Sequence, residues 1–264
     1  MKLNISKIGQ NKPEIVVVGC LHGDEIIGKK VINDLRRLTL LRGSLKFVIA
    51  NELALSKKKR MIQKDLNRSF PGKKKGLYEE RLAYYLKKEL KSADYVIDIH
   101  ATNANFDKLV IVTDWEKPTK DFLRMIPSKK VALIKKNVFG GGEMIREVKR
   151  GVAIEYGPDK GGKNYKKALR DVLIILANLK MVKSTGRIYR NKDLYVVYDS
   201  YKVPPTFKQN KRLKDFQLIK KGSPVGKVGN KNLISENSFY PLFLGRGKYK
   251  GNLAIMADKK KIVI

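Results

Sequence analysis

Short continuous apolar runs alternate along the first two-thirds of the chain with apolar positions at helical spacing. The runs are typical of strands buried on both faces. They predict strands at Glu14 to Leu21, Leu45 to Ala50, Tyr95 to Ile99, Leu109 to Val112, Val131 to Ile134 and Val152 to Ile154. Between them, three sets of apolar residues recur every three or four positions, which predicts amphipathic helices. These sets run from Ile27 to Leu38, from Tyr78 to Leu90 and from Tyr165 to Leu179.

Alternating strands and helices indicate an α/β fold with a mostly parallel sheet. One long polar stretch, Asn51 to Lys75, interrupts the alternation. Loops of this length inside a compact domain are usually functional or disordered. We therefore expect this loop to carry part of a functional site.

The pattern changes after Lys183. Short β-rich stretches at Tyr195 to Tyr198, Val225 to Val228 and Leu253 to Met256 are separated by glycine and proline turns. Such spacing predicts a small all-β domain. The sequence thus predicts two domains, residues 1–183 and 184–264, and we find no internal repeat.

Composition adds a strong positive charge to this picture. The chain has 264 residues, of which 42% are hydrophobic, enough for an ordinary core. Its 58 basic and 25 acidic residues give a net charge of +33, which attracts anions. The basic runs at 57–60 and 73–75 contain no interleaved aromatic residues, and no nucleic-acid module is recognisable. Charge therefore predicts only non-specific nucleic-acid binding.

The sequence has no apolar run of eighteen residues and no basic segment followed by an apolar one at its start. We therefore expect a cytoplasmic protein with no membrane partner. The single cysteine, Cys20, ends a buried strand, which favours a packed thiol over a nucleophile.

The two histidines of the chain, His22 and His100, both follow or end predicted strands. Glu25 lies three residues after His22, a spacing that lets both side chains face one ion. Two imidazoles and one carboxylate form the ligand set of a catalytic zinc site, with a fourth position left for water. Because ligands of open α/β sheets bind at the carboxyl ends of strands, we predict that these residues form one site.

Two further carboxylates are candidates at the same strand ends. Asp98 precedes His100 by two residues, so it shares a face of the strand and can orient the imidazole. Alternatively, it caps a nearby loop. Glu155 follows the strand Val152 to Ile154 and precedes a Tyr-Gly-Pro turn. It is the candidate base for hydrolysis, the alternative being a solvated carboxylate at a strand end.

The long loop contributes Arg60, Asp65, Asn67 and Arg68. Arginine and asparagine suit the recognition of a carboxylate, because the planar guanidinium and the amide can both donate to it. On spacing alone, however, Arg60 is a solvated member of a basic run.

Five short segments in order resemble the succinylglutamate desuccinylase/aspartoacylase family, which belongs to the zinc carboxypeptidase-like superfamily. They are Val17-Val-Gly-Cys-Leu-His-Gly-Asp-Glu25, Asn51-Glu-Leu-Ala54 with Arg60, Asp65-Leu-Asn-Arg-Ser-Phe-Pro-Gly72, Asp98-Ile-His-Ala-Thr102 and Ile154-Glu-Tyr-Gly-Pro158. A tail with Tyr240-Pro-Leu-Phe243 and Tyr249 is also similar to the family's C-terminal domain. The resemblance implies a three-layer α/β/α catalytic domain and a small β domain that covers the cleft.

By this resemblance the chain is a deacylase (amidohydrolase) with one Zn²⁺, which cleaves a small N-acyl amino acid or a related anionic amide or ester. His22, Glu25 and His100 match the zinc ligands. Glu155 matches the base that assists attack by zinc-bound water, and Arg60 matches the arginine that polarises the carbonyl. Residues matching those that bind the substrate and its carboxylate are Asn67, Arg68, Tyr249 and either Arg146 or Arg150, of which Arg146 is the expected one.

Two departures from the family pattern stand out. Glu52 follows Asn51 where the family often has proline, and Tyr156 follows Glu155 where a small aliphatic residue is common. The tyrosine is expected to narrow or re-polarise the pocket, so acyl-group specificity does not carry over.

Two other functions remain as alternatives. One is a zinc carboxypeptidase acting on peptide C-termini, although the 75 positions between Glu25 and His100 are few for that type. The other is a basic protein that binds anions or nucleic acid on a hydrolase fold. The sequence leaves the acyl group, the native metal and the oligomeric state open.

Overall fold

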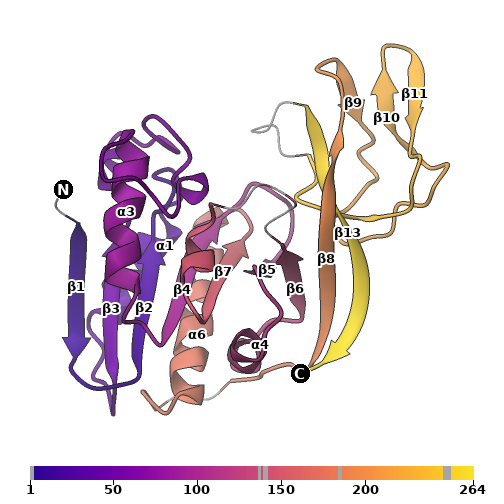
Figure 1. Cartoon of the computed structure of the whole chain (residues 1–264). Helices are drawn as coiled ribbons and strands as arrows, with labels where there is room; N and C mark the ends of the chain where they lie inside the picture. The colour runs from indigo at the N-terminus through magenta and orange to yellow at the C-terminus, as the bar shows by residue number, and fades with distance from the viewer. Residues whose placement is uncertain (1–2, 136–137, 139–141, 184–185, 246–250) are drawn as a thin grey trace.

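The core of the protein is one ten-stranded sheet in the order β1-β3-β2-β4-β7-β5-β6-β8-β13-β12 (Figure 1). The computed structural model describes residues 3–135, 138, 142–183, 186–245 and 251–264. The strands of this sheet are β1 (Asn4–Gly9), β2 (Glu14–Gly19), β3 (Ser44–Ile49), β4 (Tyr95–Ala101), β5 (Lys108–Val112), β6 (Lys130–Ile134), β7 (Gly151–Tyr156), β8 (Asn191–Lys202), β12 (Tyr240–Leu242) and β13 (Asn252–Val263).

Strand direction divides the sheet into two parts. β3, β2, β4 and β7 are parallel neighbours, whereas β1 is antiparallel to β3. β5 is antiparallel to β7, and β6 and β8 then follow it in parallel. The predicted mixed, mostly parallel sheet is thus confirmed. In the parallel part, the carboxyl ends of β2, β4 and β7 meet at one edge.

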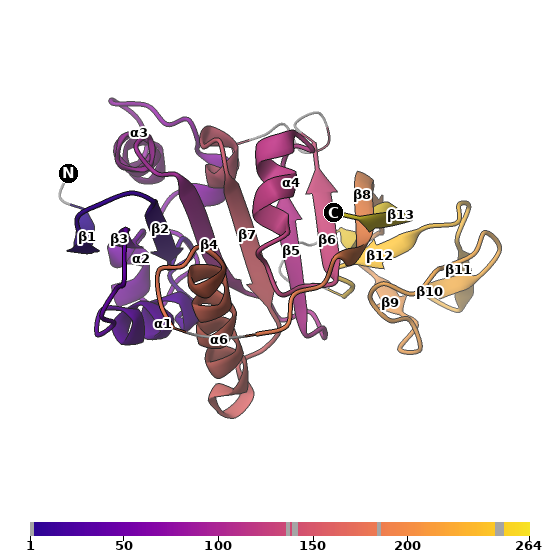
Figure 2. The same ribbon diagram turned by 90° about the horizontal axis from the view of Figure 1, so that it is seen from below.

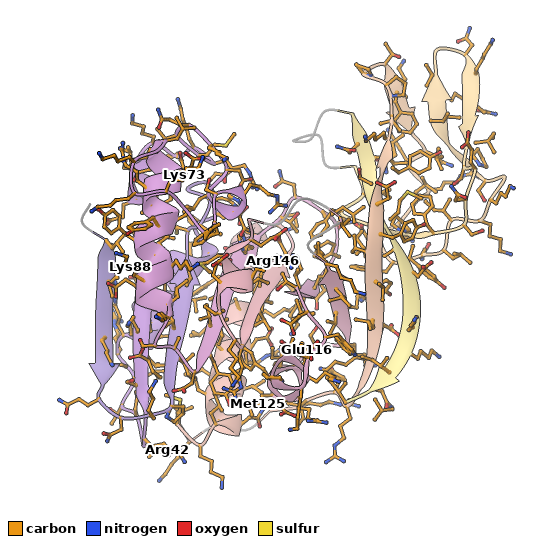
Figure 3. All side chains as sticks on the ribbon, in the orientation of Figure 1. Arg42, Lys73, Lys88, Glu116, Met125 and Arg146 are labelled. Atoms are coloured by element: carbon orange, nitrogen blue, oxygen red, sulfur yellow. The ribbon has the colours of Figure 1, made fainter. Side chains whose placement is uncertain are left out.

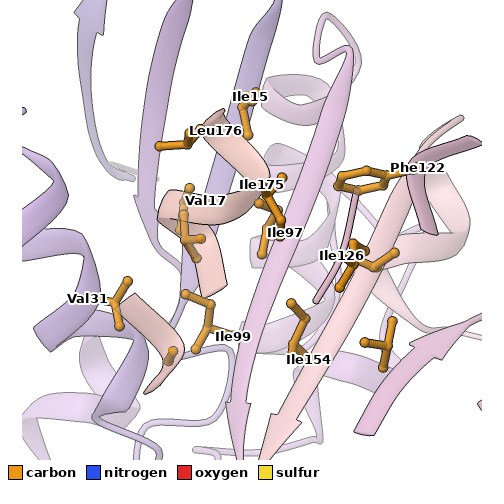
Figure 4. Close-up of a cluster of buried hydrophobic side chains, with 14 of the residues drawn as sticks. Ile15, Val17, Val31, Ile97, Ile99, Phe122, Ile126, Ile154, Ile175 and Leu176 are labelled. Atoms are coloured by element: carbon orange, nitrogen blue, oxygen red, sulfur yellow. The ribbon is translucent and has the colours of Figure 1, made fainter. Parts of the chain in front are cut away.

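Helices cover both faces of this sheet, which makes the three layers predicted (Figure 2). On one face, α1 (Ile27–Leu35) and α6 (Lys163–Asn178) pack on apolar strand residues, together with α4 (Lys117–Leu123) (Figure 4). Each fully buried branched or aromatic side chain there contributes roughly 1.5–3 kcal/mol. On the other face, α3 (Tyr78–Leu90) covers β2, β3 and β4 with the short turn η2 (Met144–Glu147).

Every residue of β2 is buried, as its continuous apolar run predicts. Gly19 and Gly28 explain how closely α1 lies on the sheet. A Cβ at Gly19 would stand 2.7 Å from the backbone of Gly28, so neither position has room for a side chain. This contact fixes where the chain leaves β2 and therefore where His22 and Glu25 begin.

The segment after residue 183 is β-rich, as predicted, but much of it extends the main sheet. β8 pairs in parallel with β6, and β13 and β12 follow β8. Only β9 (Phe207–Gln209), β10 (Pro224–Val228) and β11 (Lys231–Ile234) form a separate small sheet. The hydrogen-bonded sheet is thus continuous across the predicted boundary, and the division into domains 1–183 and 184–264 stays a prediction.

The predicted loop from Asn51 to Lys75 is partly helical, which corrects that expectation. It contains α2 (Glu52–Ser56) and the 3-10 turn η1 (Leu66–Arg68). Asn51 caps α2 by accepting a hydrogen bond from the Ala54 N–H, and Asp65 caps η1 through the Asn67 N–H. Within the described ranges, no helix combines the length and the apolar character that crossing a membrane requires.

Candidate active site

His22 and Glu25 lie on a tight turn directly after β2. A Cβ at Gly23 would come within 2.2 Å of the Ala54 backbone, so this turn requires glycine beside α2. The Gly23 N–H donates to the Arg60 carbonyl over 3.2 Å, which ties the turn to the long loop. Backbone contacts alone therefore bring Arg60 next to the first histidine.

His22, Glu25 and His100 converge on one buried point, as predicted. Nδ1 of His22 lies 2.9 Å from one Glu25 oxygen, and Nδ1 of His100 lies 2.9 Å from the other. One ligand atom from each of the three residues lies within 4.8 Å of the others. All three side chains are at least nine-tenths buried. A single ion can therefore be held by all three.

The outer nitrogen of each ring faces a carboxylate. Nε2 of His100 lies 2.7 Å from Oδ2 of Asp98, and Nε2 of His22 lies 3.1 Å from Oδ1 of Asp65. Such partners fix the tautomer and leave Nδ1 available as a ligand atom. Asp98 thus takes the orienting role predicted for it, whereas the corresponding role of Asp65 was missed.

The charges in this cluster strongly perturb one another. Burial alone would raise the pKa of the Glu25 carboxyl, but His100 and His22 hold it well below its ordinary value. Burial alone would lower the pKa of His100, but Asp98 and Glu25 raise it well above its usual range. The pKa of His22 is raised as well, against burial, by Glu25 and Asp65. Negative charge is therefore in excess here, which suits a divalent cation.

Arg60 belongs to this cluster and is not a solvated member of the basic run. Its Nη1 donates to Glu25 over 3.1 Å and its Nη2 donates to Asp65 over 3.0 Å. Against the cost of burial, His22 and Arg60 hold the pKa of Asp65 far below its ordinary value. The loop thus supplies the cluster with one cation and one carboxylate.

Glu155 is the neighbour of His100 across the sheet. The two residues are register partners on β4 and β7, so their side chains share the face that carries Asp98. Adjacent strands are about 4.8 Å apart, which places the Glu155 carboxylate beside the metal-ligand cluster. The partly buried Glu155 is therefore close enough to serve a reaction there.

Tyr156 does not narrow the pocket, and that expectation was wrong. It follows Glu155 on β7 and so points to the opposite face. Its side chain is fully buried in the cluster under α6, and its hydroxyl donates to Asp171 over 3.0 Å. The tyrosine therefore affects packing behind the site and not the site itself.

Asn67 and Arg68 lie beside Asp65 and, within the described ranges, make no hydrogen bond or ion pair with the three candidate metal ligands. The Asn67 N–H donates to the Asp65 oxygen that also faces His22, and Asn67 Oδ1 accepts from the Met144 N–H. Arg68 is 42% exposed and lies 3.9 Å from Glu143. η1 thus places Asn67 beside Asp65 and leaves Arg68 partly exposed next to it.

The structure does not bring Arg146 or Arg150 to the cluster. Arg146, labelled in Figure 3, donates to the carbonyls of Thr113 and Ile134. Thr113 directly follows β5, at the opposite end of that strand from Leu109, which pairs with Glu155. Arg150 lies over the Tyr95 ring, where β4 begins. Tyr249 is outside the described residues. Substrate binding by Arg146 and Tyr249 stays a prediction.

The sequence analysis did not identify Glu79, which holds the long loop in place. Its fully buried carboxylate accepts hydrogen bonds from the N–H groups of Ile62, Gln63 and Lys64, over 2.6 to 3.1 Å. Asn51 adds a fourth contact at 3.4 Å. One sequence signal could have revealed it, because Glu79 lies on the apolar face of the helix, in line with Leu82 and Leu86.

Cys20 is a packed thiol, as predicted. It is fully buried, and burial raises the pKa of its thiol to about 11. A thiol with so high a pKa is not a nucleophile near neutral pH.

Comparisons with known proteins relate this chain to deacylases. Residues 11–134 match the model of the succinylglutamate desuccinylase/aspartoacylase catalytic domain. A probable aspartoacylase of Prochlorococcus marinus strain MIT 9515 is 28% identical over 291 residues, covering 96% of each chain. A probable aspartoacylase of Acaryochloris marina is 32% identical over 115 residues, covering 38% of this chain and 39% of that one.

Solved structures show the same fold at lower identity. Murine aminoacylase 3 has a TM-score of 0.77 at 20% identity, covering 97% of this chain and 98% of its own. A succinylglutamate desuccinylase/aspartoacylase from Rhodobacter sphaeroides also has a TM-score of 0.77, at 18% identity, covering 97% of this chain and 88% of its own.

Fold, site and sequence together define a hydrolase of the deacylase class. The catalytic-domain match and the aspartoacylase relatives support the succinylglutamate desuccinylase/aspartoacylase family for this chain, and the solved structures share its fold. The matched range contains the four sequence segments between Val17 and Thr102, whereas Ile154–Pro158 and the C-terminal tail lie outside it.

Proposed function

We propose that this protein is a zinc-dependent deacylase that hydrolyses a small N-acyl amino acid or a related anionic amide or ester. The observation that carries the proposal is the convergence of His22 Nδ1, His100 Nδ1 and both Glu25 oxygens, each contact being 2.9 Å. Similarity to this family supports the reaction class.

The ligand set fits zinc by its chemistry. Two neutral imidazoles and one carboxylate are typical of catalytic zinc, and Asp98 and Asp65 keep both rings in the required tautomer. A bound zinc ion would lower the pKa of a water molecule and polarise the substrate carbonyl. His22, Glu25 and His100 would hold it.

Glu155 and Arg60 divide the remaining chemistry between them. Glu155 takes a proton from the attacking water and returns it to the leaving amine as the C–N bond breaks. The guanidinium of Arg60, beside the metal ligands, stabilises the negative charge that develops on the carbonyl oxygen. The products are a carboxylate and a free amine.

An anionic substrate agrees with the positive charge of the partly exposed Arg68. Asn67 and Arg68 lie two and three residues after Asp65, and the 42% exposed Arg68 can meet a substrate carboxylate with two parallel hydrogen bonds. We propose that these two residues select substrates with a carboxylate. The cytoplasmic location stays a prediction.

Metal content tests the proposal most directly. Protein purified without added metal or a histidine tag should contain about one zinc per chain, and His22→Ala should lose it. Circular dichroism of His22→Ala then shows whether the variant is folded, which separates loss of metal from loss of fold. A folded wild type that neither contains nor takes up zinc would contradict the proposal.

A substrate screen then separates the two hydrolase alternatives. We expect turnover of N-acyl amino acids and none of peptides with free C-termini. Turnover of peptides alone would identify a carboxypeptidase with the same metal ligands instead.

A further inference from the structure

A second cavity lies on the other face of the sheet from the metal-ligand cluster. It has a volume of about 440 Å³ and lies between the start of β5, residues 127–130, α6 and residues 186–189. Ligand pockets of proteins commonly have volumes of this order. Asp171 lines this cavity and accepts a hydrogen bond from the Tyr156 hydroxyl. Because Tyr156 and Glu155 are successive residues of β7 and point to opposite faces, β7 separates the cavity from Glu155. We call it the cationic pocket.

Six basic residues and two acidic ones line the cationic pocket. The basic residues are Lys108, Lys129, Lys130, Lys167, Arg170 and Arg187. Both acids are already neutralised by lysines of the same pocket. Lys108 Nζ lies 2.5 Å from Asp171, and Lys167 pairs with Asp107. The lining therefore keeps a surplus of positive charge.

Three cations supply that surplus at the mouth. Lys129 and Arg187 both lie over the ring of Tyr189, each 5.2 Å from its centre, and Arg170 projects from α6. Within the described ranges, none of these three forms an ion pair with a carboxylate. Lys130 is engaged elsewhere, with its Nζ 5.0 Å from the centre of the Phe216 ring. The three residues are thus available to an anion.

A further buried cation, Lys192, lies near the lining residue Lys108 but does not itself line the pocket. Lys108 donates to the Pro127 carbonyl, and Lys192 donates to the carbonyls on either side of it, those of Ile126 and Ser128. Burial, together with repulsion from Lys108, lowers the pKa of Lys192 to about 8. A bound anion would relieve this repulsion.

We propose that the cationic pocket binds a small oligophosphate, such as a di- or triphosphate group. Guanidinium groups match phosphate oxygens with paired hydrogen bonds. A triphosphate carries three to four negative charges at neutral pH, which balances Lys129, Arg170 and Arg187. A recess of this size holds such a group, whereas a nucleic-acid strand needs an extended basic groove with several stacking aromatic residues.

Calorimetric titration with sodium tripolyphosphate at 150 mM salt tests this site. We expect saturable one-to-one binding by the wild type, at least about tenfold weaker in Lys129→Ala/Arg170→Ala/Arg187→Ala. A matched control, Lys208→Ala/Lys220→Ala/Lys221→Ala, removes the same charge from exposed positions elsewhere and should bind like the wild type. Single Arg170→Ala and Arg187→Ala variants guard against misfolding of the triple variant.

Tripolyphosphate also binds metals, so the titration is repeated with His22→Ala. Binding that persists there belongs to the cationic pocket, whatever the outcome for zinc. Equal weakening in both triple variants, or no saturable binding at this salt concentration, would overturn the proposal. Tight binding of single-stranded RNA without binding of tripolyphosphate would also overturn it, in favour of an extended polyanion.

Discussion

The end of β7 separates two environments of opposite charge. Glu155 faces the cluster of His22, Glu25 and His100, where the surrounding carboxylates leave an excess of negative charge. Tyr156, the next residue, faces the cationic pocket side, where lysines and arginines outnumber acids. In a chain with a net charge of +33, a group of four carboxylates, those of Glu25, Asp65, Asp98 and Glu155, thus lies where a metal would bind.

This difference teaches how one strand can serve two chemistries. Successive side chains of a strand point to opposite faces, so adjacent residues experience unrelated surroundings. The comparison also gives the net charge a physical interpretation, because the charge is not spread evenly over the site. Substitutions on each face should therefore have separable effects.

The largest difference in kcat is expected between the variants Glu155→Gln and Tyr156→Phe. Glutamine cannot accept the proton, so kcat should fall by about 100- to 10,000-fold while the metal stays bound. Tyr156→Phe should change kcat by less than about threefold and lower stability by about 1 kcal/mol, because one buried hydrogen bond to Asp171 is lost. Steady-state kinetics with metal analysis of both variants measures this. Substantial turnover by Glu155→Gln would remove Glu155 as the base.

On the cationic side, Lys192 should make stability depend on pH. Its pKa falls from an ordinary 10.5 to about 8 on folding, because of burial and the charge of Lys108. Between these values the unfolded chain binds more protons than the folded one, so stability rises with pH. The destabilisation caused by burying the charged Lys192 is complete below pH 8 and disappears above pH 10.5. The free energy of unfolding therefore changes by up to about 3 kcal/mol over this range.

Urea unfolding of the wild type and Lys192→Met at pH 7 and pH 10 isolates this contribution. As the pH rises, the free energy of unfolding of the wild type should increase relative to that of Lys192→Met. Lys220→Met, at an exposed position, serves as the control and should show a constant difference. A constant difference for Lys192→Met as well would mean that the buried lysine is not repelled by its surroundings.

On the metal side, Asp98→Asn should weaken zinc binding about 10- to 100-fold, because the amide holds the His100 ring less firmly than the carboxylate at 2.7 Å. Competition with a chromogenic chelator measures the affinity. Asp258→Asn, at an exposed position on β13, is the control. Unchanged affinity in Asp98→Asn would show that Asp98 only caps a loop.

Much of the fold could be predicted because its signals are local. The continuous apolar runs identified β2, β3 and β4, and helical spacing identified α1, α3 and α6. Strand order is a matter of long-range pairing and left no local signal. For that reason the continuation of the sheet from β6 into β8 was not foreseen.

The site was predictable to the extent that its residue types are rare. A chain with two histidines leaves little choice of imidazole ligands, and strand ends placed them correctly. Lysines and arginines are abundant, so spacing alone did not show that Arg60 joins the cluster, and only the family resemblance indicated it. Nothing in the sequence showed that Arg146 binds the carbonyls of Thr113 and Ile134. The roles of Asp65 and Glu79 depend on backbone donors that only folding brings near.

The smallest expected effect tests whether the metal side depends on its supporting loop. Glu79 lies between α3 and residues 62–64, and these connect Arg60 with Asp65. Glutamine has one acceptor oxygen in place of two, so at least one backbone N–H would lose its partner. Because Arg60 and Asp65 would then be held less firmly, Glu79→Gln should lower kcat/KM about five- to tenfold and stability by about 1–2 kcal/mol.

Glu89→Gln on the same helix is the matched control, since the Glu89 side chain is 43% exposed and, among the residues that the structure describes, pairs with Lys46 and with no loop backbone. Kinetics, metal content and urea unfolding of both variants separate the possible causes. Loss of stability with unchanged kcat/KM would assign Glu79 to the fold alone. Loss of activity in a zinc-loaded, folded Glu79→Gln protein would instead show that the arginine must be held in place, and that a buried carboxylate outside the cluster helps to hold it.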